Sequence, residues 1–396
     1  MLLTPLITPL EKVRQKNGYY LLTEGESLSE VTYTVLAKLN GLSAEQASRA
    51  GNTKELSPHQ FHIGPGFYGE PDPTTILPRR GNNVFATIAE TLWVYAGRND
   101  IETLSKWLPR AKEYSDDGLK WSSGYGPRLR AWIDHNFKTF DQIETVVRRL
   151  RAKPDSRQAL ITIWDPATDG QKEGSKDYTC NICLHFLIRD GGLNMFVTTR
   201  SNDIIFGVAI NVFEWCFLAN YIAACLGVPF RNYYQTGSSL HLYDWKSDTA
   251  KKILDRPFLP LPFLELAEKK RLRSNSLLPL QLRNLCEEIF LGAYREELTS
   301  FRPGYATDLT PRLADCFYAL RAEKRLLESS PTNYIRALSE ISYPPLLLSL
   351  LDIGQRRRKE PLWQAEDFDK LWKDTKNEGI AGHYLRKLFE RNEIKT

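Results

Sequence analysis

Two cysteines three positions apart, Cys180 and Cys183, precede a pair of predicted strands. The Cys-x-x-Cys spacing is typical of redox and zinc sites, but no second pair lies at a matching distance and the six histidines are scattered along the chain. A nucleophilic cysteine is the sharper hypothesis, because the reactive form is the thiolate, which a nearby cation favours. Arg200, followed by Ser201, ends the second predicted strand and supplies that cation. The sequence therefore predicts covalent chemistry at Cys180 and no metal site.

Polar residues also interrupt a long apolar run at 204–227, which contains Asn211, Glu214 and Asn220. The run is long enough to resemble a membrane span, but a carboxylate near the centre of a span costs about 2.5–3.5 kcal/mol. We therefore expect a buried helix of a soluble protein and no membrane partner. Polar side chains inside such a helix need partners or a purpose.

Helices and strands must together position these residues. Strand-like patterns cover residues 158–164, 184–188, 193–199 and 230–236. Apolar residues at helical spacing cover 28–39, 84–97 and 143–150. The run Asp190-Gly191-Gly192 predicts a hairpin turn, and Thr139 with Gln142 predicts the start of a helix. These patterns indicate one core of mixed α/β type.

The composition changes after residue 255. Pro257, Pro260 and Pro262 make a linker-like stretch. Leu-rich helical patterns follow at 278–297, 310–327, 334–351 and 368–389. We expect three parts, which are an N-terminal segment of the catalytic domain at 1–80, the catalytic core at 81–255 and an all-helical C-terminal extension at 256–396.

The overall composition limits the class of protein. A chain of 396 residues that is 42% hydrophobic buries a sizeable core. The net charge of +5 resides entirely in residues 246–396, which hold 27 basic and 22 acidic residues, so nucleic acid could bind only through this basic C-terminal region. Six cysteines in so long a chain make no disulfide framework, and the first residues lack a signal-peptide pattern. Both observations predict a cytoplasmic protein.

Dispersed residues fall in the order and spacing of a known family. The matching positions downstream are Cys180, Phe186, Asp190-Gly191, Arg200-Ser201-x-Asp203, Gly207, Asn211 and His241-Leu242-Tyr243. The matching positions upstream are Glu90 with Leu92-Trp93, Gly124-Tyr125-Gly126 with Arg130-Ala131-Trp132, and Pro154-Asp155-Ser156-Arg157. Together they resemble thymidylate synthase and the related pyrimidine nucleotide hydroxymethylases over about residues 80–245.

The resemblance implies an α/β (α+β) fold with three layers around a twisted mixed sheet. It also implies dUMP as the substrate and 5,10-methylenetetrahydrofolate as the co-substrate, with no metal. A homodimer packed sheet against sheet would bring Arg157 of one subunit to the phosphate site of the other. If the gene belongs to a phage, the location would be the host cytoplasm.

By resemblance, four residues carry the reaction. The Cys180 thiolate would add to carbon 6 of uracil, so that carbon 5 can attack the methylene group of the folate. Glu90 would organise water and proton transfers at O4 and C5, and Tyr125 would assist proton removal at C5. Asn211 would read the base by donating to O4 and accepting from N3–H, whereas the cytosine-specific hydroxymethylases resemble this pattern with an aspartate there.

The other implied residues hold the two ligands. Those that would bind the phosphate are Arg49, Arg157, Arg200 and Ser201. Those that would bind the ribose 3′-hydroxyl are His241 and Tyr243. Those that would contact the folate are Asp203 and Glu90.

Departures from the synthase pattern bear on the product. The chain has Asn181 and His185 where synthases usually have His and Gln, and Gln158 in place of a second arginine. Near Ala111 no tryptophan matches the one that packs beside the folate, and the helical extension replaces the short closing tail.

A site that excludes water less well favours addition of water over hydride transfer. We therefore expect a dUMP hydroxymethyltransferase, like resembling phage enzymes that make modified DNA precursors. The alternatives are thymidylate synthase, an enzyme acting on UMP, and a non-catalytic nucleotide- or RNA-binding protein.

Overall fold

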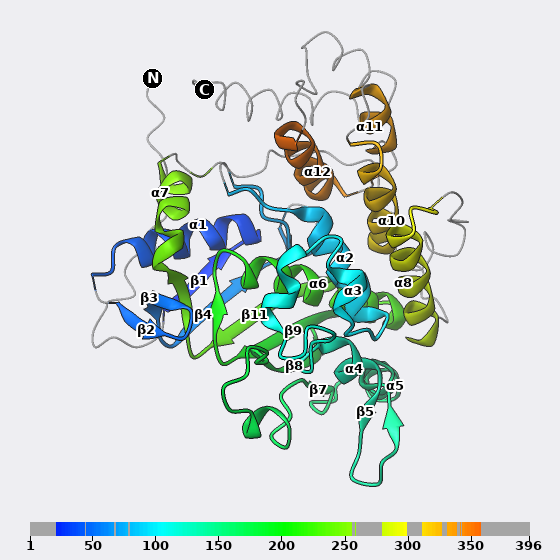
Figure 1. Ribbon diagram of the computed structural model, residues 1–396. Helices are drawn as coiled ribbons and strands as arrows, with labels where there is room; N and C mark the ends of the chain where they lie inside the picture. Colours follow the sequence, from blue (N-terminus) through cyan, green and yellow to red (C-terminus); the bar gives the residue numbers. More distant parts are fainter. Residues whose placement is uncertain are drawn as a thin grey trace.

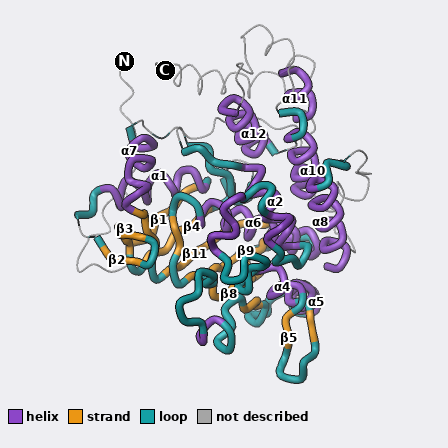
Figure 2. The backbone as a smooth tube through the Cα atoms, in the orientation of Figure 1, coloured by secondary structure: helices purple, strands orange, loops and turns teal. Residues whose placement is uncertain are grey.

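The computed structural model describes residues 21–43, 45–66, 69–77, 80–255, 258, 279–298, 311–326, 331–338, 341 and 343–357. The expected linker prolines 257, 260 and 262 and the expected helix at 368–389 lie outside these residues. Within them, helices and strands form one body of mixed α/β type (Figures 1 and 2).

The centre of the fold is a six-stranded mixed sheet with the strand order β1-β4-β11-β9-β8-β7. The strands are β1 (Leu21–Gly25), β4 (His59–Ile63), β7 (Leu160–Thr162), β8 (Asn181–Arg189), β9 (Gly192–Thr199) and β11 (Phe230–Gly237). Strand β1 runs parallel to β4 and β11 parallel to β9, while the other pairs are antiparallel. The mixed sheet and the three predicted strands at its centre are confirmed.

The β8–β9 hairpin turns at the predicted place. Asp190 and Gly191 have φ angles of 51° and 72°, so both lie in the left-handed region that a tight two-residue hairpin requires. Asp tolerates this region better than most residues, and Gly has no Cβ to hinder it. The turn fixes the strand register and pairs Asn181 with Thr199 at the open end of the hairpin.

A second sheet lies next to the first, with the order β10-β12-β3-β2. Its strands are β2 (Gln46–Ser48), β3 (Gly51–Leu56), β10 (Asn202–Asp203) and β12 (Leu240–Tyr243). Because β10 follows β9 after two residues, the end of the central hairpin leads directly into this sheet. A third, two-stranded sheet consists of β5 (Trp132–Ile133) and β6 (Thr139–Phe140).

The long apolar run forms helix α6 (Gly207–Leu226), which packs on β9 and β11 of the central sheet. By length and composition this helix could cross a membrane, but 94% of its most apolar window is buried inside the protein, as in a core helix. It ends at Gly227, whose φ of 69° gives the left-handed cap that glycine favours. The prediction of a buried helix is therefore confirmed.

Helix α2 (Val84–Tyr95) packs against α6. All of its residues are buried except Glu90, which is half-buried. Asn83 begins the helix by accepting a hydrogen bond from the Ala86 amide at 3.4 Å. The other helices before residue 255 are α1 (Leu28–Asn40), α3 (Ile101–Leu104), η2 (Pro109–Tyr114), α4 (Tyr125–Arg130), α5 (Gln142–Ala152), η3 (Asp169–Gln171), η4 (Asp244–Lys246) and α7 (Ser247–Leu254).

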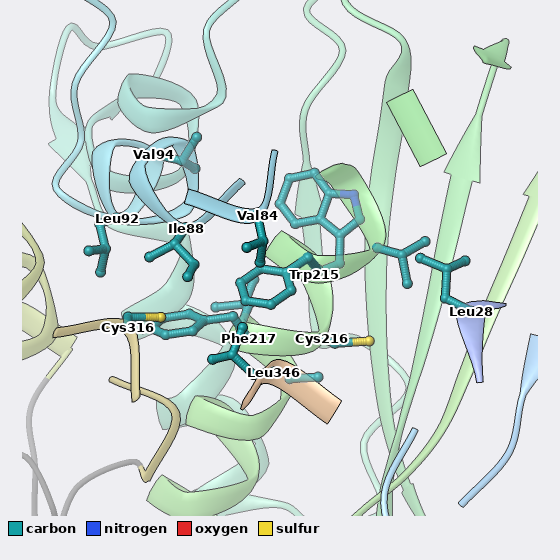
Figure 3. Close-up of a cluster of buried hydrophobic side chains, with 14 of the residues drawn as sticks. Leu28, Val84, Ile88, Leu92, Val94, Trp215, Cys216, Phe217, Cys316 and Leu346 are labelled. Atoms are coloured by element: carbon teal, nitrogen blue, oxygen red, sulfur yellow. The ribbon is translucent and has the colours of Figure 1, made fainter. Parts of the chain in front are cut away.

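Four helices follow residue 255 in the described part, and three of them cover α2. They are α8 (Pro279–Tyr294), α10 (Pro311–Glu323), α11 (Pro331–Leu338) and α12 (Pro344–Arg357). Helices α8, α10 and α12 contact α2. Figure 3 shows Cys316 and Leu346 from these helices in one cluster with Ile88, Leu92 and Phe217. The described residues of the expected extension are mainly helical, and their buried side chains belong to the same hydrophobic core as α2 and α6. The three expected domain ranges stay predictions.

Polar contacts tie this helical layer to the rest of the fold. The Tyr343 hydroxyl donates to Asp72 at 3.0 Å, and the Trp107 indole N–H donates to Glu323 at 2.7 Å. Arg356 of α12 donates to the backbone carbonyl of Asn82, directly before α2, at 2.7 Å. The layer is thus fixed to the chain segments that enter and follow α2.

Candidate active site

Cys180 lies at the open end of the β8–β9 hairpin, where the register places it beside Arg200. The Arg200 guanidinium donates to the Thr179 carbonyl at 2.7 Å, which holds its charge in place. Its Nη2 lies 3.8 Å and the Ser201 hydroxyl 3.9 Å from the Cys180 sulfur. A guanidinium at this distance interacts favourably with a negatively charged sulfur. The structure therefore places Arg200 and Ser201 beside Cys180, as the sequence predicts. Cys180 is half-buried.

Arg49 approaches the same region from the turn between β2 and β3. Its guanidinium donates to the carbonyls of Ser175 and Lys176 at 3.4 and 3.5 Å, and lies 5.8 Å from the centre of the Tyr178 ring. These residues lead directly to Cys180, so Arg49 is held beside the segment that carries the cysteine.

Arg157 lies elsewhere, exposed on the segment between α5 and β7. Leu160 pairs with His185, the middle residue of β8, and Arg157 lies three positions before Leu160. The ring nitrogen Nε2 of His185 lies 3.1 Å from the Arg157 carbonyl, so Arg157 lies beside a residue that is about 17 Å along the chain from Cys180. Within one chain, Arg157 therefore does not join the Cys180 cluster.

Asn211 lies on α6, close to the start of β8. Its Oδ1 accepts from the side-chain amides of Asn181 at 3.2 Å and Asn202 at 3.4 Å, and its Nδ2 donates to Glu214 at 3.3 Å. Asn181, at the position where the synthases have histidine, donates to the Tyr125 hydroxyl at 2.7 Å. Cys180 and Asn211 are thus linked through the residue that follows the cysteine.

Tyr125 joins this network through its hydroxyl group, which accepts from Asn181. It packs against Trp215 with ring centres 5.4 Å apart. Burial, and then the charge of Cys180, raises the pKa of Tyr125, so its hydroxyl stays protonated near neutral pH. Because the hydroxyl accepts from Asn181, its own proton is available to donate to a ligand.

Two carboxyl groups, Glu90 on α2 and Glu214 on α6, interact electrostatically. Burial raises the pKa of Glu90 to about 7, and burial together with the charge of Glu90 raises the pKa of Glu214. One oxygen of each group, Oε2 of Glu90 and Oε1 of Glu214, is buried without a hydrogen-bond partner among the described residues. Two close carboxylates in such surroundings cannot both ionise easily, so the pair retains a proton near neutral pH.

Asp203 and His241 pair across the parallel strands β10 and β12. The Asp203 carboxylate accepts from the backbone amides of Ile205 at 2.9 Å and Phe206 at 3.2 Å. Burial raises its pKa to about 6, so it is mostly ionised at neutral pH. Burial lowers the pKa of His241, which favours the neutral ring, and the ring of Tyr243 lies 4.9 Å from it, edge to face.

Two charged residues near these groups were not among the predicted site residues. Arg80 is buried, donates to the Ile205 carbonyl and to the Thr75 hydroxyl, and interacts electrostatically with Asp203. Glu214 holds Asn211, as described above. The sequence signal for Glu214 is its spacing three residues after Asn211 on one helix face. Arg80 has a weaker signal, as one of two arginines before Gly81.

The described residues contain no group of three or more His, Cys, Asp or Glu side chains that could hold a metal ion. The donors described above are instead guanidinium, amide, hydroxyl and carboxyl groups around one thiol. Such a set suits an anionic ligand with a planar, hydrogen-bonding ring.

Comparison with known proteins supports the resemblance. A family model described as thymidylate synthase matches residues 73–294. A deoxyuridylate hydroxymethyltransferase of Bacillus phage SP01 is 35% identical over 203 residues, which are 50% of this chain and 52% of that protein. Proteins of the same name from Pseudomonas phage M6 and Delftia phage PhiW-14 are 36% and 32% identical over 167 and 241 residues.

These matches cover 42% and 57% of this chain and 46% and 63% of the two phage proteins. The chain thus spans about half the length of the curated relatives it matches. The family match covers more than half of the chain and agrees with the mixed fold. It includes the strands β8, β9 and β11 and the helices α2, α6 and α8. The chain therefore belongs to the thymidylate synthase family.

Proposed function

We propose that this protein transfers a one-carbon unit from 5,10-methylenetetrahydrofolate to carbon 5 of dUMP and releases 5-hydroxymethyl-dUMP. The observation that carries the proposal is the Cys180 sulfur, which lies 3.8 Å from the Arg200 guanidinium and is linked through Asn181 to Asn211 and Tyr125. The names of the phage relatives support the hydroxymethyl product.

In this proposal the Cys180 thiolate adds to carbon 6 of uracil, and the ring electrons move to carbon 5, which then forms the new carbon–carbon bond. Arg200, Ser201 and Arg49 hold the phosphate, since guanidinium groups match phosphate geometry. Asn211 contacts the base edge, while His241 and Tyr243 contact the ribose 3′-hydroxyl. His241 suits a neutral hydroxyl, because burial favours its uncharged ring.

Members of this family use 5,10-methylenetetrahydrofolate, which supplies the carbon at the oxidation level of formaldehyde. The residues of this chain fit its pterin ring, because Asp203 and Glu90 offer carboxyl oxygens to ring N–H groups. Glu90 has a buried oxygen with no partner among the described residues, and Asp203 is mostly ionised at neutral pH. We assign the pterin contact to these two residues.

The hydroxymethyl product requires four further changes. These are loss of the carbon 5 proton, departure of tetrahydrofolate, addition of water to the exocyclic methylene group left on carbon 5, and release of the Cys180 thiolate from carbon 6. A general base is most effective when its pKa lies near the working pH, and burial raises the pKa of Glu90 to about 7. Glu90 therefore accepts the proton of the incoming water in this proposal. Hydride transfer in place of water would give dTMP, the product of a thymidylate synthase.

A binding role for nucleic acid is less well supported. Arg356 and Arg357 of the basic region form ion pairs with Asp352 and Glu323 of the chain itself. Their charges are thereby partly neutralised before any phosphate backbone arrives.

We further propose a homodimer in which Arg157 reaches the phosphate site of the second subunit. An aromatic row crosses β4, β11, β9 and β8 on one face of the central sheet, formed by His62, Tyr234, Phe196 and His185. Neighbouring ring centres lie 4.5, 4.9 and 6.2 Å apart, and the side chains are half-exposed in one chain. This face suits contact with a second copy, in the cytoplasm of the cell in which the protein is made.

The test is a product analysis with purified protein, dUMP and 5,10-methylenetetrahydrofolate. We expect 5-hydroxymethyl-dUMP with tetrahydrofolate. Formation of dTMP with dihydrofolate would identify a synthase, and no product from either dUMP or UMP would favour the binding role. The variant Cys183→Ala is the matched control for Cys180→Ala, because Cys183 lies on β8, which begins directly after Cys180, and is also half-buried.

A further inference from the structure

Glu214 is the most deeply buried carboxyl group beside the site. Its side chain is fully buried on α6, one turn after Asn211. Its backbone carbonyl accepts from the Tyr95 hydroxyl at 2.7 Å, which holds this turn of α6 against α2. A buried carboxyl group without a cation partner is unfavourable for folding, so its presence beside a ligand site calls for a functional reason.

Within the described part of the chain, the groups that interact with Glu214 include no positive charge. These groups are Asn211 on the same helix, Glu90 and Tyr95 on α2, Tyr125 on α4 and Tyr233 on β11. A carboxyl group among phenols, an amide and a second carboxyl serves as a hydrogen-bond partner rather than as half of an ion pair. Its contact in the structure is the Nδ2 atom of Asn211.

The hydrogen bonds settle which way the Asn211 amide points. The indole N–H of Trp215 can only donate, and it donates to Oδ1 of Asn181 at 3.2 Å. The NH₂ group of Asn181 therefore faces Oδ1 of Asn211, at 3.2 Å. The NH₂ group of Asn211 consequently faces Glu214, whose Oε2 accepts from it at 3.3 Å. Glu214 is therefore the last acceptor in a chain of hydrogen bonds that begins at the indole N–H of Trp215.

A reversed Asn211 amide would turn its NH₂ group toward the NH₂ groups of Asn181 and Asn202, and it would lose the hydrogen bond that Glu214 accepts from it. Uracil presents N–H at N3 and an oxygen at C4, whereas cytosine presents the opposite pattern. An amide that can turn over reads both bases, but an amide fixed in one sense reads only one of them.

We propose that Glu214 is a positioning residue, which fixes the Asn211 amide in one orientation and thereby makes the site accept uracil and reject cytosine. This inference rests on the proposed function, because it takes a pyrimidine nucleotide as the ligand. The nucleotide touches Asn211, and Glu214 acts through that amide from inside the core.

The test compares the affinities for dUMP and dCMP, measured by titration calorimetry without folate. The wild-type protein is expected to prefer dUMP, and Glu214→Leu is expected to lose at least about tenfold of that preference. Glu214→Gln keeps a carbonyl oxygen opposite Asn211 and should retain the preference within about threefold. Asn220→Leu is the matched control, since it makes the same kind of polar-to-apolar change on the same helix.

Two further measurements separate positioning from a structural role. Removal of an uncompensated buried carboxyl should leave the melting temperature of Glu214→Leu equal to or above that of the wild type. A lower melting temperature with unchanged nucleotide preference would indicate a structural residue and overturn the inference. A loss of preference in the Gln variant as large as in the Leu variant would also contradict it. An acceptor oxygen at position 214 would then not suffice to orient the Asn211 amide.

The outcomes distinguish this inference from the proposed function. If the wild type prefers dUMP and Glu214→Leu keeps that preference, only the inference fails. If the wild type binds neither nucleotide, the proposed function fails. If the wild type prefers dUMP and Glu214→Leu loses the preference, but the product is dTMP, the inference stands and the hydroxymethyl assignment fails.

Discussion

The Arg200 guanidinium lies 3.8 Å from the Cys180 sulfur, and the β8–β9 hairpin between the two residues brings them to this distance. Cys180 and Arg200 are 20 positions apart, but the Asp190-Gly191 turn makes them neighbours, so a sequence pattern could place them together. In the sequence Glu214 shows only as an interruption of an apolar run, because its proposed positioning role depends on the orientation of the Asn211 amide. That orientation is visible only in the hydrogen bonds that link Trp215, Asn181, Asn211 and Glu214, which a sequence pattern does not connect.

At Cys180, replacement by alanine should reduce turnover by at least about a thousandfold, because no other side chain described here can form the carbon 6 adduct. Binding of dUMP should remain within about tenfold, since Arg200 and Asn211 keep their places. Steady-state kinetics and calorimetric titration measure the two effects. Turnover in Cys180→Ala equal to that of the Cys183→Ala control would contradict the role of the nucleophile.

At Glu90, activity should rise with pH. Burial raises the pKa of this carboxyl to about 7, so the group is protonated below that pH and cannot accept a proton from water. A pH profile of kcat should therefore climb between about pH 6 and 8, and Glu90→Gln should flatten it and lower turnover about a hundredfold. A profile that falls over this range would exclude Glu90 as the base.

Element types were predicted more reliably than element boundaries. Thr139 with Gln142 resembles a helix start, but Asp141 provides the cap of α5 by accepting from the Glu144 amide at 3.0 Å. One helix was expected at 334–351, whereas the structure has α11 and α12 with a break before Pro344. Proline lacks an amide hydrogen and suits the first turn of a new helix, so the two prolines there begin α12.

The helices after residue 255 should unfold together with the catalytic core. Phe290 of α8 is fully buried and lies 5.3 Å from the ring of Trp107, which belongs to the catalytic part. Phe290→Ala should therefore destabilise the whole chain by about 3–5 kcal/mol, within a single cooperative transition. Phe137→Ala is the control, because that ring is 89% exposed and its removal should change stability by less than about 0.5 kcal/mol. Two separated transitions would indicate that the helical layer folds independently.

At the scale of the whole molecule, the mixed fold and its helical extension could be predicted, but the packing of the extension could not. The sequence shows that α2 is apolar on nearly every face, which requires a cover on each side. It does not say which segment provides that cover, because α8, α10 and α12 begin 184, 216 and 249 residues after the end of α2.

The proposed homodimer predicts complementation between inactive variants. Because Arg157 lies far from Cys180 of its own chain, Cys180→Ala and Arg157→Ala subunits should form a mixed dimer with one complete site. After random reassociation of equal amounts, about a quarter of the wild-type activity should return, since half of the dimers are mixed and each has one of two sites. Activity that stays at the level of the unmixed variants would mean that Arg157 does not act across subunits.

The origin of the hydroxymethyl oxygen tests the central claim most directly. The reaction of dUMP and 5,10-methylenetetrahydrofolate is run in water enriched in heavy oxygen, and the nucleotide product is analysed by mass spectrometry. The account predicts 5-hydroxymethyl-dUMP that carries the heavy oxygen in its new hydroxyl group, with release of tetrahydrofolate. Unlabelled dTMP with dihydrofolate would contradict it.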